Sequence, residues 1–317
     1  MFNWIIRLHF AFVLLICGEL IGWQQASTYR IQDWVLVFLI YMAAGSLLLD
    51  IISRWKVDSF PTLLLTAGLF GLIEGTLITL AARDSDNAGV GIVFRPMGLE
   101  VLMFLLAFWM FRLALSGRQV GTREFIVLAV VGAGWGIWVR WFPELEYNRS
   151  SPTLEGSLPF VLMGLLLAGV IPVGFSLFKS PGVPRWQLSV YELAGVLGVL
   201  VTALIFRAEY LDTLTLTMTA GILIFILFTL YFTRSSREKS LLDEPVEKPQ
   251  WLGRLILLFP FAALAWLGYD LSDAGETPLQ ADILFGAVTL FGALWLPILY
   301  LWLGYTNMAQ IFRESYS

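Results

Sequence analysis

The chain is built from long apolar runs separated by short polar turns. Ten runs of about 20 residues can be counted, at 4–24, 34–53, 60–82, 97–117, 125–143, 158–178, 187–206, 212–233, 251–270 and 281–304. Roughly 20 apolar residues in a helix cover the ~30 Å hydrocarbon core of a bilayer. Apolar residues show little helical periodicity inside such runs, so the length of a run identifies it as a membrane-spanning helix. The pattern predicts an all-α polytopic integral membrane protein: one transmembrane domain over residues 1–317, a helical bundle of about ten transmembrane helices.

Charge in the turns predicts the orientation. The turns after the second, fourth, sixth and eighth runs are basic, and the alternate turns are acidic. By the positive-inside rule the basic side is cytoplasmic, which places both termini inside and agrees with an even number of spans. We expect a cytoplasmic linker at about 234–250 and an outer acidic loop at about 143–157. The first run lacks a good cleavage site after it, so we expect it to be retained.

Composition agrees with this class and narrows the chemistry. Of 317 residues, 58% are hydrophobic and 14% are charged, whereas soluble domains carry about 25% charge. The net charge of −4 argues against nucleic-acid binding, which needs a basic surface. One cysteine and one histidine exclude an internal disulfide, bis-histidine haem ligation and an H-E-x-x-H zinc site. We therefore expect no metal site, no cofactor and no nucleic-acid partner. The expected location is the cytoplasmic (inner) membrane of a prokaryote.

The third run holds one carboxylate among small residues. Glu74 falls near its middle, and Gly71 and Gly75 form a G-x-x-x-G spacing that lets another helix approach closely. An ionisable group at that depth costs on the order of 3 kcal/mol, which makes Glu74 a candidate site. It could bind a cation or carry a proton. The alternative is a structural carboxylate that is protonated or hydrogen-bonded to a neighbouring helix.

Two further carboxylates are expected in the outer half of the membrane with Glu74. Glu19 lies beyond the centre of the first run, and Glu100 opens the fourth. The three would form an acidic vestibule if the first, third and fourth helices meet. Glu100 also has a structural explanation, because acidic residues are favoured at the positive end of the helix dipole.

A second group of polar residues is expected on the inner side. It consists of Asp50, Arg112, Tyr191 and Glu192. Arg112, like Arg7 in the first run, is expected to reach toward the headgroups, as long basic side chains near helix ends do. Glycines and prolines mark candidate positions for kinks or breaks in several helices, among them alternating Gly132, Gly134 and Gly136 in the fifth run and Pro297 in the tenth.

Three functional hypotheses remain. The leading one is a membrane carrier for a small solute or lipid, coupled to a proton or cation through Glu74 with Glu19 or Glu100. The first alternative is a non-catalytic integral membrane subunit or scaffold of a larger complex, which would have a membrane protein partner. The second is an intramembrane enzyme that acts on a lipid-linked substrate through Asp50, Arg112 and Glu192. The lipid bilayer is a partner in all three.

Overall fold

The structure is a computed structural model, and it describes residues 2–23, 30–78, 88–116, 120–147, 154–172, 184–234, 239–243, 255–272 and 279–315. Nearly every residue in these ranges is helical, and none of them forms a strand. The predicted all-α class is therefore confirmed.

The helices follow the order of the apolar runs. In the first half they are α1 (Phe2–Leu15) with its π-helical continuation η1 (Ile16–Trp23), α2 (Ile31–Arg54), α3 (Phe60–Leu77), α4 (Ala88–Phe94), the π-helical η3 (Arg95–Leu99), α5 (Glu100–Leu115) and α6 (Thr122–Tyr147). In the second half they are α7 (Leu154–Val170), α8 (Val190–Ala208), α9 (Thr213–Phe232), α11 (Leu258–Leu271) and α12 (Leu279–Ser315).

Within the described ranges, eight helical stretches are long and apolar enough to cross a membrane, and α4, η3 and α5 together supply one of them. The helices α7 and α11 are apolar but shorter, at 17 and 14 residues. Each predicted run overlaps one of these ten apolar helices. The protein is thus a multi-pass membrane protein, while the count of ten spans and the cytoplasmic termini stay predictions.

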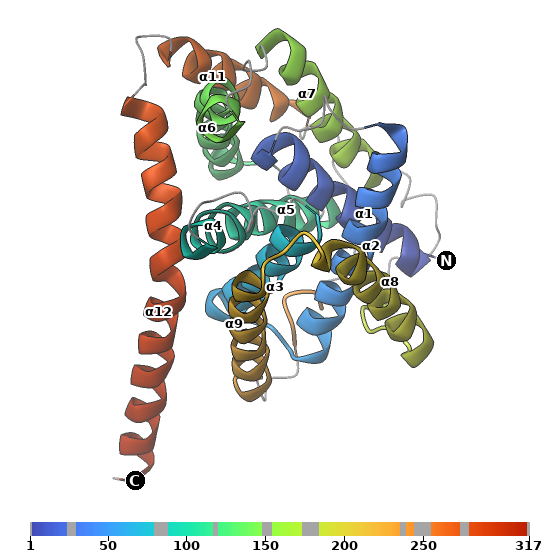
Figure 1. Cartoon of the computed structure of the whole chain (residues 1–317), viewed down its shortest axis with the longest axis vertical. Helices are drawn as coiled ribbons and strands as arrows, with labels where there is room; N and C mark the ends of the chain where they lie inside the picture. The colour runs from blue at the N-terminus through green and yellow to red at the C-terminus, as the bar shows by residue number, and fades with distance from the viewer. Residues whose placement is uncertain are drawn as a thin grey trace.

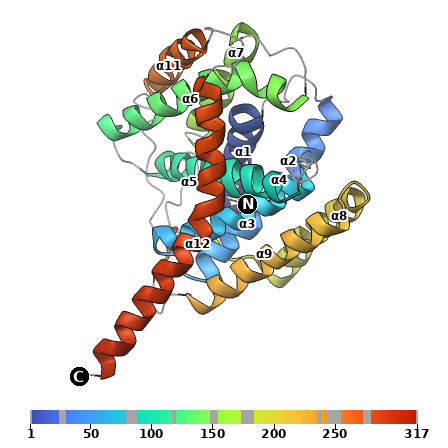
Figure 2. The ribbon, with the colours of Figure 1, turned by 60° about the vertical axis from the view of Figure 1, so that its left-hand side comes forward.

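The first helices of the chain form the centre of the molecule, and later ones surround it. α1, α2, α3 and α5 are mostly buried, whereas α8, α9 and α12 expose most of their apolar surface (Figures 1 and 2). α12 crosses α4 and η3 steeply, and its C-terminal part extends away from the other helices. Exposed apolar surface on these peripheral helices is what contact with a bilayer requires.

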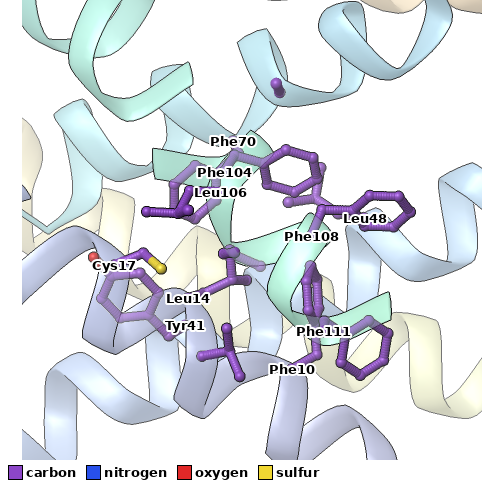
Figure 3. Packing of buried hydrophobic residues seen from close by; sticks show 14 of the residues in the cluster. Phe10, Leu14, Cys17, Tyr41, Leu48, Phe70, Phe104, Leu106, Phe108 and Phe111 are labelled. Carbon is purple, nitrogen blue, oxygen red and sulfur yellow. The ribbon is translucent and has the colours of Figure 1, made fainter. Parts of the chain in front are cut away.

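Aromatic side chains fill the space between α1, α3 and α5. Phe104, Phe108 and Phe111 follow one side of α5, among Phe10 from α1 and Phe70 from α3 (Figure 3). The ring centroids of Phe70 and Phe104 are 5.4 Å apart, and those of Phe10 and Phe111 are 4.7 Å apart. Aromatic pairs at such separations contribute about 0.5–1.5 kcal/mol beyond their buried area. This packing fixes the distance between the three helices.

The glycines of α6 serve close packing instead of a break. α6 is continuous through Gly132 and Gly136, and a methyl group at either would collide with a backbone carbonyl of α11. Gly268 of α11 lies equally close to the carbonyl of Ala133. The chain is therefore not unwound at these glycines, and α12 is likewise continuous through Pro297. Small residues at both surfaces let the two backbones approach closely.

The expected linker and outer loop are only partly described. Within 234–250, Leu241 donates its backbone N–H to the carbonyl of Val57 at 2.8 Å, and Lys56 pairs with Asp243 at 3.8 Å. The predicted loop at 143–157 is helical at both ends, because α6 runs to Tyr147 and α7 begins at Leu154. The rest of both segments lies outside the described residues.

Candidate functional site

Three buried carboxylates meet where α3, α5 and η1 pack together. Glu19, Glu74 and Glu100 are each 0% exposed, and both α3 and η1 lie against α5. The side chain of Glu100 lies near that of Glu74 and interacts electrostatically with Glu19. The helix contacts that the acidic vestibule required are therefore present. The three carboxylates form a buried cluster that solvent does not reach.

Glycines in α3 create room for this meeting. Gly71 and Gly75 lie against Pro96 of η3, where a methyl group at either position would collide with the proline. Proline lacks a backbone N–H and interrupts the helical hydrogen-bond ladder, which accounts for the π-helical stretch at this point. The close approach predicted from the G-x-x-x-G spacing brings η3 to the side of Glu74.

A buried arginine joins the carboxylates. Arg95, at the start of η3, is 1% exposed and acts electrostatically on Glu100. The sequence analysis missed it because the fourth run was started at residue 97, which left Arg95 in the preceding turn. The apolar stretch 88–94 was the available signal, since it carries the helix back beyond Arg95 and the membrane-crossing stretch begins at Gly91. We call Glu19, Glu74, Arg95 and Glu100 the buried ionic cluster.

Aromatic side chains from three helices surround the cluster. Tyr41 of α2 donates its hydroxyl to Oε1 of Glu19 at 3.2 Å. Phe104 lies one turn after Glu100, and Phe70 one turn before Glu74, so the aromatic core lies directly beside the carboxyl groups. Both π-helical stretches, η1 and η3, each supply one charged member of the cluster. Such irregular turns occur mainly at functional sites.

The charges of the cluster determine its chemistry. Three carboxylates against one guanidinium would leave a net charge of −2 if all were ionised. Two ionised carboxylates that lie close together in a buried site repel each other, so a proton on either Glu74 or Glu100 would relieve the repulsion. Arg95 offsets a further negative charge. The arrangement can therefore hold and exchange a proton without a large change in geometry.

The inner group is used mainly to hold residues 184–189, the segment that precedes α8. Asp50 binds Arg54 through two hydrogen bonds of 2.9 Å and accepts the backbone N–H of Leu188 at 2.7 Å. Arg7 is buried and donates to the carbonyl of Trp186 at 2.7 Å, so its expected reach to the headgroups is wrong. These contacts are structural anchors between helices distant in sequence.

Of the other inner residues, Glu192 contacts the same segment through Ser189. Glu192 caps α8 by accepting hydrogen bonds from Ser189, and it accepts the indole N–H of Trp4 at 2.9 Å. Tyr191 is 90% exposed. Arg112 is half-buried on α5. Among the described residues, no three His, Cys, Asp or Glu side chains come close enough together to hold a metal ion.

Comparison with known proteins gives one relative. No family profile matches the chain, and no solved structure matches it. A stretch of 96 residues, 30% of the chain, is 33% identical to the fluoride-specific ion channel FluC of Cupriavidus metallidurans and covers 73% of that protein. Together with the multiple apolar helices, this similarity identifies a membrane transporter or channel for a small solute. By the length and identity of the match, the chain belongs to the family of this channel.

Proposed function

We propose that the chain carries a small solute across the cytoplasmic membrane of a prokaryote, and that Glu74 and Glu100 handle a proton that moves with it. The observation that carries this proposal is the pair of neighbouring carboxyl groups of Glu74 and Glu100, fully buried between α3 and α5. Ionisable groups inside membrane segments are expensive and mark ion pathways and proton relays. A pair that shares one proton is the simplest such relay.

Arg95 gives the same cluster a positive charge. A guanidinium can hold a small anion, and its charge is retained at all physiological pH values. An anion near Arg95 and a proton on the carboxyl pair would enter together without changing the net charge of the cluster. Fluoride, the ion named for the similar channel, is therefore the first solute to test.

The buried ionic cluster must open for transport. Its four members are at most 1% exposed, so the structure corresponds to a conformation closed to both sides. Irregular backbone beside a binding site is a recurrent means of opening in carriers. We assign this role to η1 and η3, whose π-helical turns flank Glu19 and Arg95.

The test is flux through purified protein in liposomes. A fluoride gradient is applied, external fluoride is followed with a selective electrode, and internal pH with an entrapped dye. Glu74→Gln keeps the shape of the side chain and removes its ionisation, so coupled proton movement and fluoride flux are expected to fall at least tenfold. Glu209→Gln, at an exposed position after α8, is the matched control and should retain both.

Three outcomes contradict the proposal. Unchanged flux and proton movement in Glu74→Gln would remove Glu74 from the mechanism. Flux without proton movement in the wild-type protein would remove the coupling. If Glu74→Gln does not fold, Glu100→Gln is measured in its place, and normal coupled flux in that variant would reject the shared-proton pair.

A further inference from the structure

An apolar groove separates α5 from α6. The two helices follow each other in sequence but do not pack along each other. Between them lies a space of about 480 Å³, with Leu102 and Trp109 on the α5 side and Val127 and Val130 on the α6 side. Two consecutive apolar helices held apart in this way leave surface that only an apolar occupant can cover favourably.

The groove has a charge at one end. Arg123, in the first turn of α6, is the one charged residue among its lining residues, and Trp138 lines it fifteen positions later. At 1.5 Å per residue these positions are about 22 Å apart along the helix. Half of the ~30 Å hydrocarbon core is covered by the acyl chain of one lipid, so one chain fits this length.

Arg123 lies where a headgroup would be. It is exposed, and it stands at the end of the membrane-crossing stretch Thr122–Arg140. The neighbouring Glu124 accepts the backbone N–H of Gly121 at 2.8 Å and does not line the groove. A guanidinium at the mouth of an apolar groove is complementary to a phosphate above an acyl chain.

We propose that the groove between α5 and α6 binds one anionic phospholipid, with an acyl chain against Trp109 and Val130 and the phosphate at Arg123. This assignment is independent of the proposed transport function, since it uses none of the residues of the buried ionic cluster. The groove extends to Leu99, the neighbour of Glu100, so a bound lipid would pack against the part of the chain that carries Glu100.

Gly134 provides a way to fill the groove. It lines the α6 side, and a Cβ atom built there would meet no atom within 4 Å. The side chain of Gly134→Leu therefore starts in open space and occupies part of the groove. Gly195→Leu is the matched control, because Gly195 on α8 is equally open and lies outside the groove.

The experiment is native mass spectrometry of the purified chain with equimolar phosphatidylglycerol and phosphatidylcholine of the same acyl composition. The wild-type protein should retain one phosphatidylglycerol in preference to phosphatidylcholine. Arg123→Gln should lower that preference about fivefold, the effect of removing about 1 kcal/mol of attraction per basic residue. Arg185→Gln, an exposed arginine outside the groove, should leave it unchanged.

The groove variants decide the location. Gly134→Leu should lose the retained lipid of either headgroup, whereas Gly195→Leu should keep it. Retention of lipid in Gly134→Leu, or an unchanged headgroup preference in Arg123→Gln, would overturn the proposal. A dimer that Gly134→Leu dissociates would show that a second copy of the chain occupies the groove, and that result also overturns it.

Discussion

Gly71 of α3 lies so close to Pro96 of η3 that a methyl group at position 71 would overlap the proline carbonyl oxygen. This contact sets the distance between α3 and the segment that carries Arg95 and Glu100. The position of Glu74 relative to the other members of the buried ionic cluster therefore depends on the absence of a side chain at Gly71.

The first prediction is that Gly71→Ala separates α3 from η3. Overpacking of this kind costs about 1–3 kcal/mol, because a backbone carbonyl cannot rotate away as a side chain can. Thermal unfolding in detergent should show the loss. Gly221→Ala on α9, where a methyl group meets nothing within 4 Å, should be neutral or slightly stabilising. Equal unfolding temperatures for the two variants would contradict the packing described.

The second prediction concerns the charge balance around Arg95. Arg95→Gln removes the positive charge that acts on Glu100, and leaving a buried charge uncompensated typically costs about 3–5 kcal/mol. Adding Glu100→Gln should recover a large part of that loss, since it removes one of the negative charges left behind. Unfolding by sodium dodecyl sulfate is measured for Arg95→Gln, for Glu100→Gln and for the double variant. Strictly additive losses would show that Arg95 and Glu100 do not interact.

The third prediction is that Asp50 holds residues 184–189 in place. Asp50→Asn weakens the interaction with Arg54 and with the N–H of Leu188, and an unsatisfied buried group costs about 1–3 kcal/mol. Limited proteolysis should then cut next to Arg185 faster than in the wild-type protein. Asp282→Asn, at an exposed position in the first turn of α12, is the control. Identical cleavage rates for Asp50→Asn and wild type would disprove the anchoring role.

The fourth prediction is a pH dependence at the start of α9. Hydrogen bonds from the hydroxyl and the backbone N–H of Thr215 lower the pKa of Asp212 below its usual value. Because the pKa is lower in the folded state, the stabilisation is present above the ordinary aspartate range and is lost as pH falls through the lowered value. The difference in stability between wild type and Asp212→Asn should shrink on acidification. A difference that grows at low pH would reverse the sign and refute this account.

The membrane class follows from the sequence alone, because length and apolar content are local properties. The G-x-x-x-G spacing beside Glu74 likewise predicted a close helix contact, since both glycines belong to the same helix and their spacing is visible in the sequence. Arg95 and Arg7 could not be interpreted in this way. Whether an arginine reaches the headgroups or is buried depends on how the surrounding helices pack. Arg95 is buried beside Glu100, five residues along the chain, and Arg7 donates to the carbonyl of the distant Trp186.

The tertiary structure decided which carboxylates act together. In a run that is apolar nearly all round, periodicity does not show which side faces another helix, so the sequence could place Glu19, Glu74 and Glu100 at similar depth but not in contact. Only the packing of α3 and η1 against α5 does that. The glycines of α6 are a second example. The sequence shows where the backbone lacks side chains, and the neighbouring helix, here α11, determines whether the helix breaks there or packs closely.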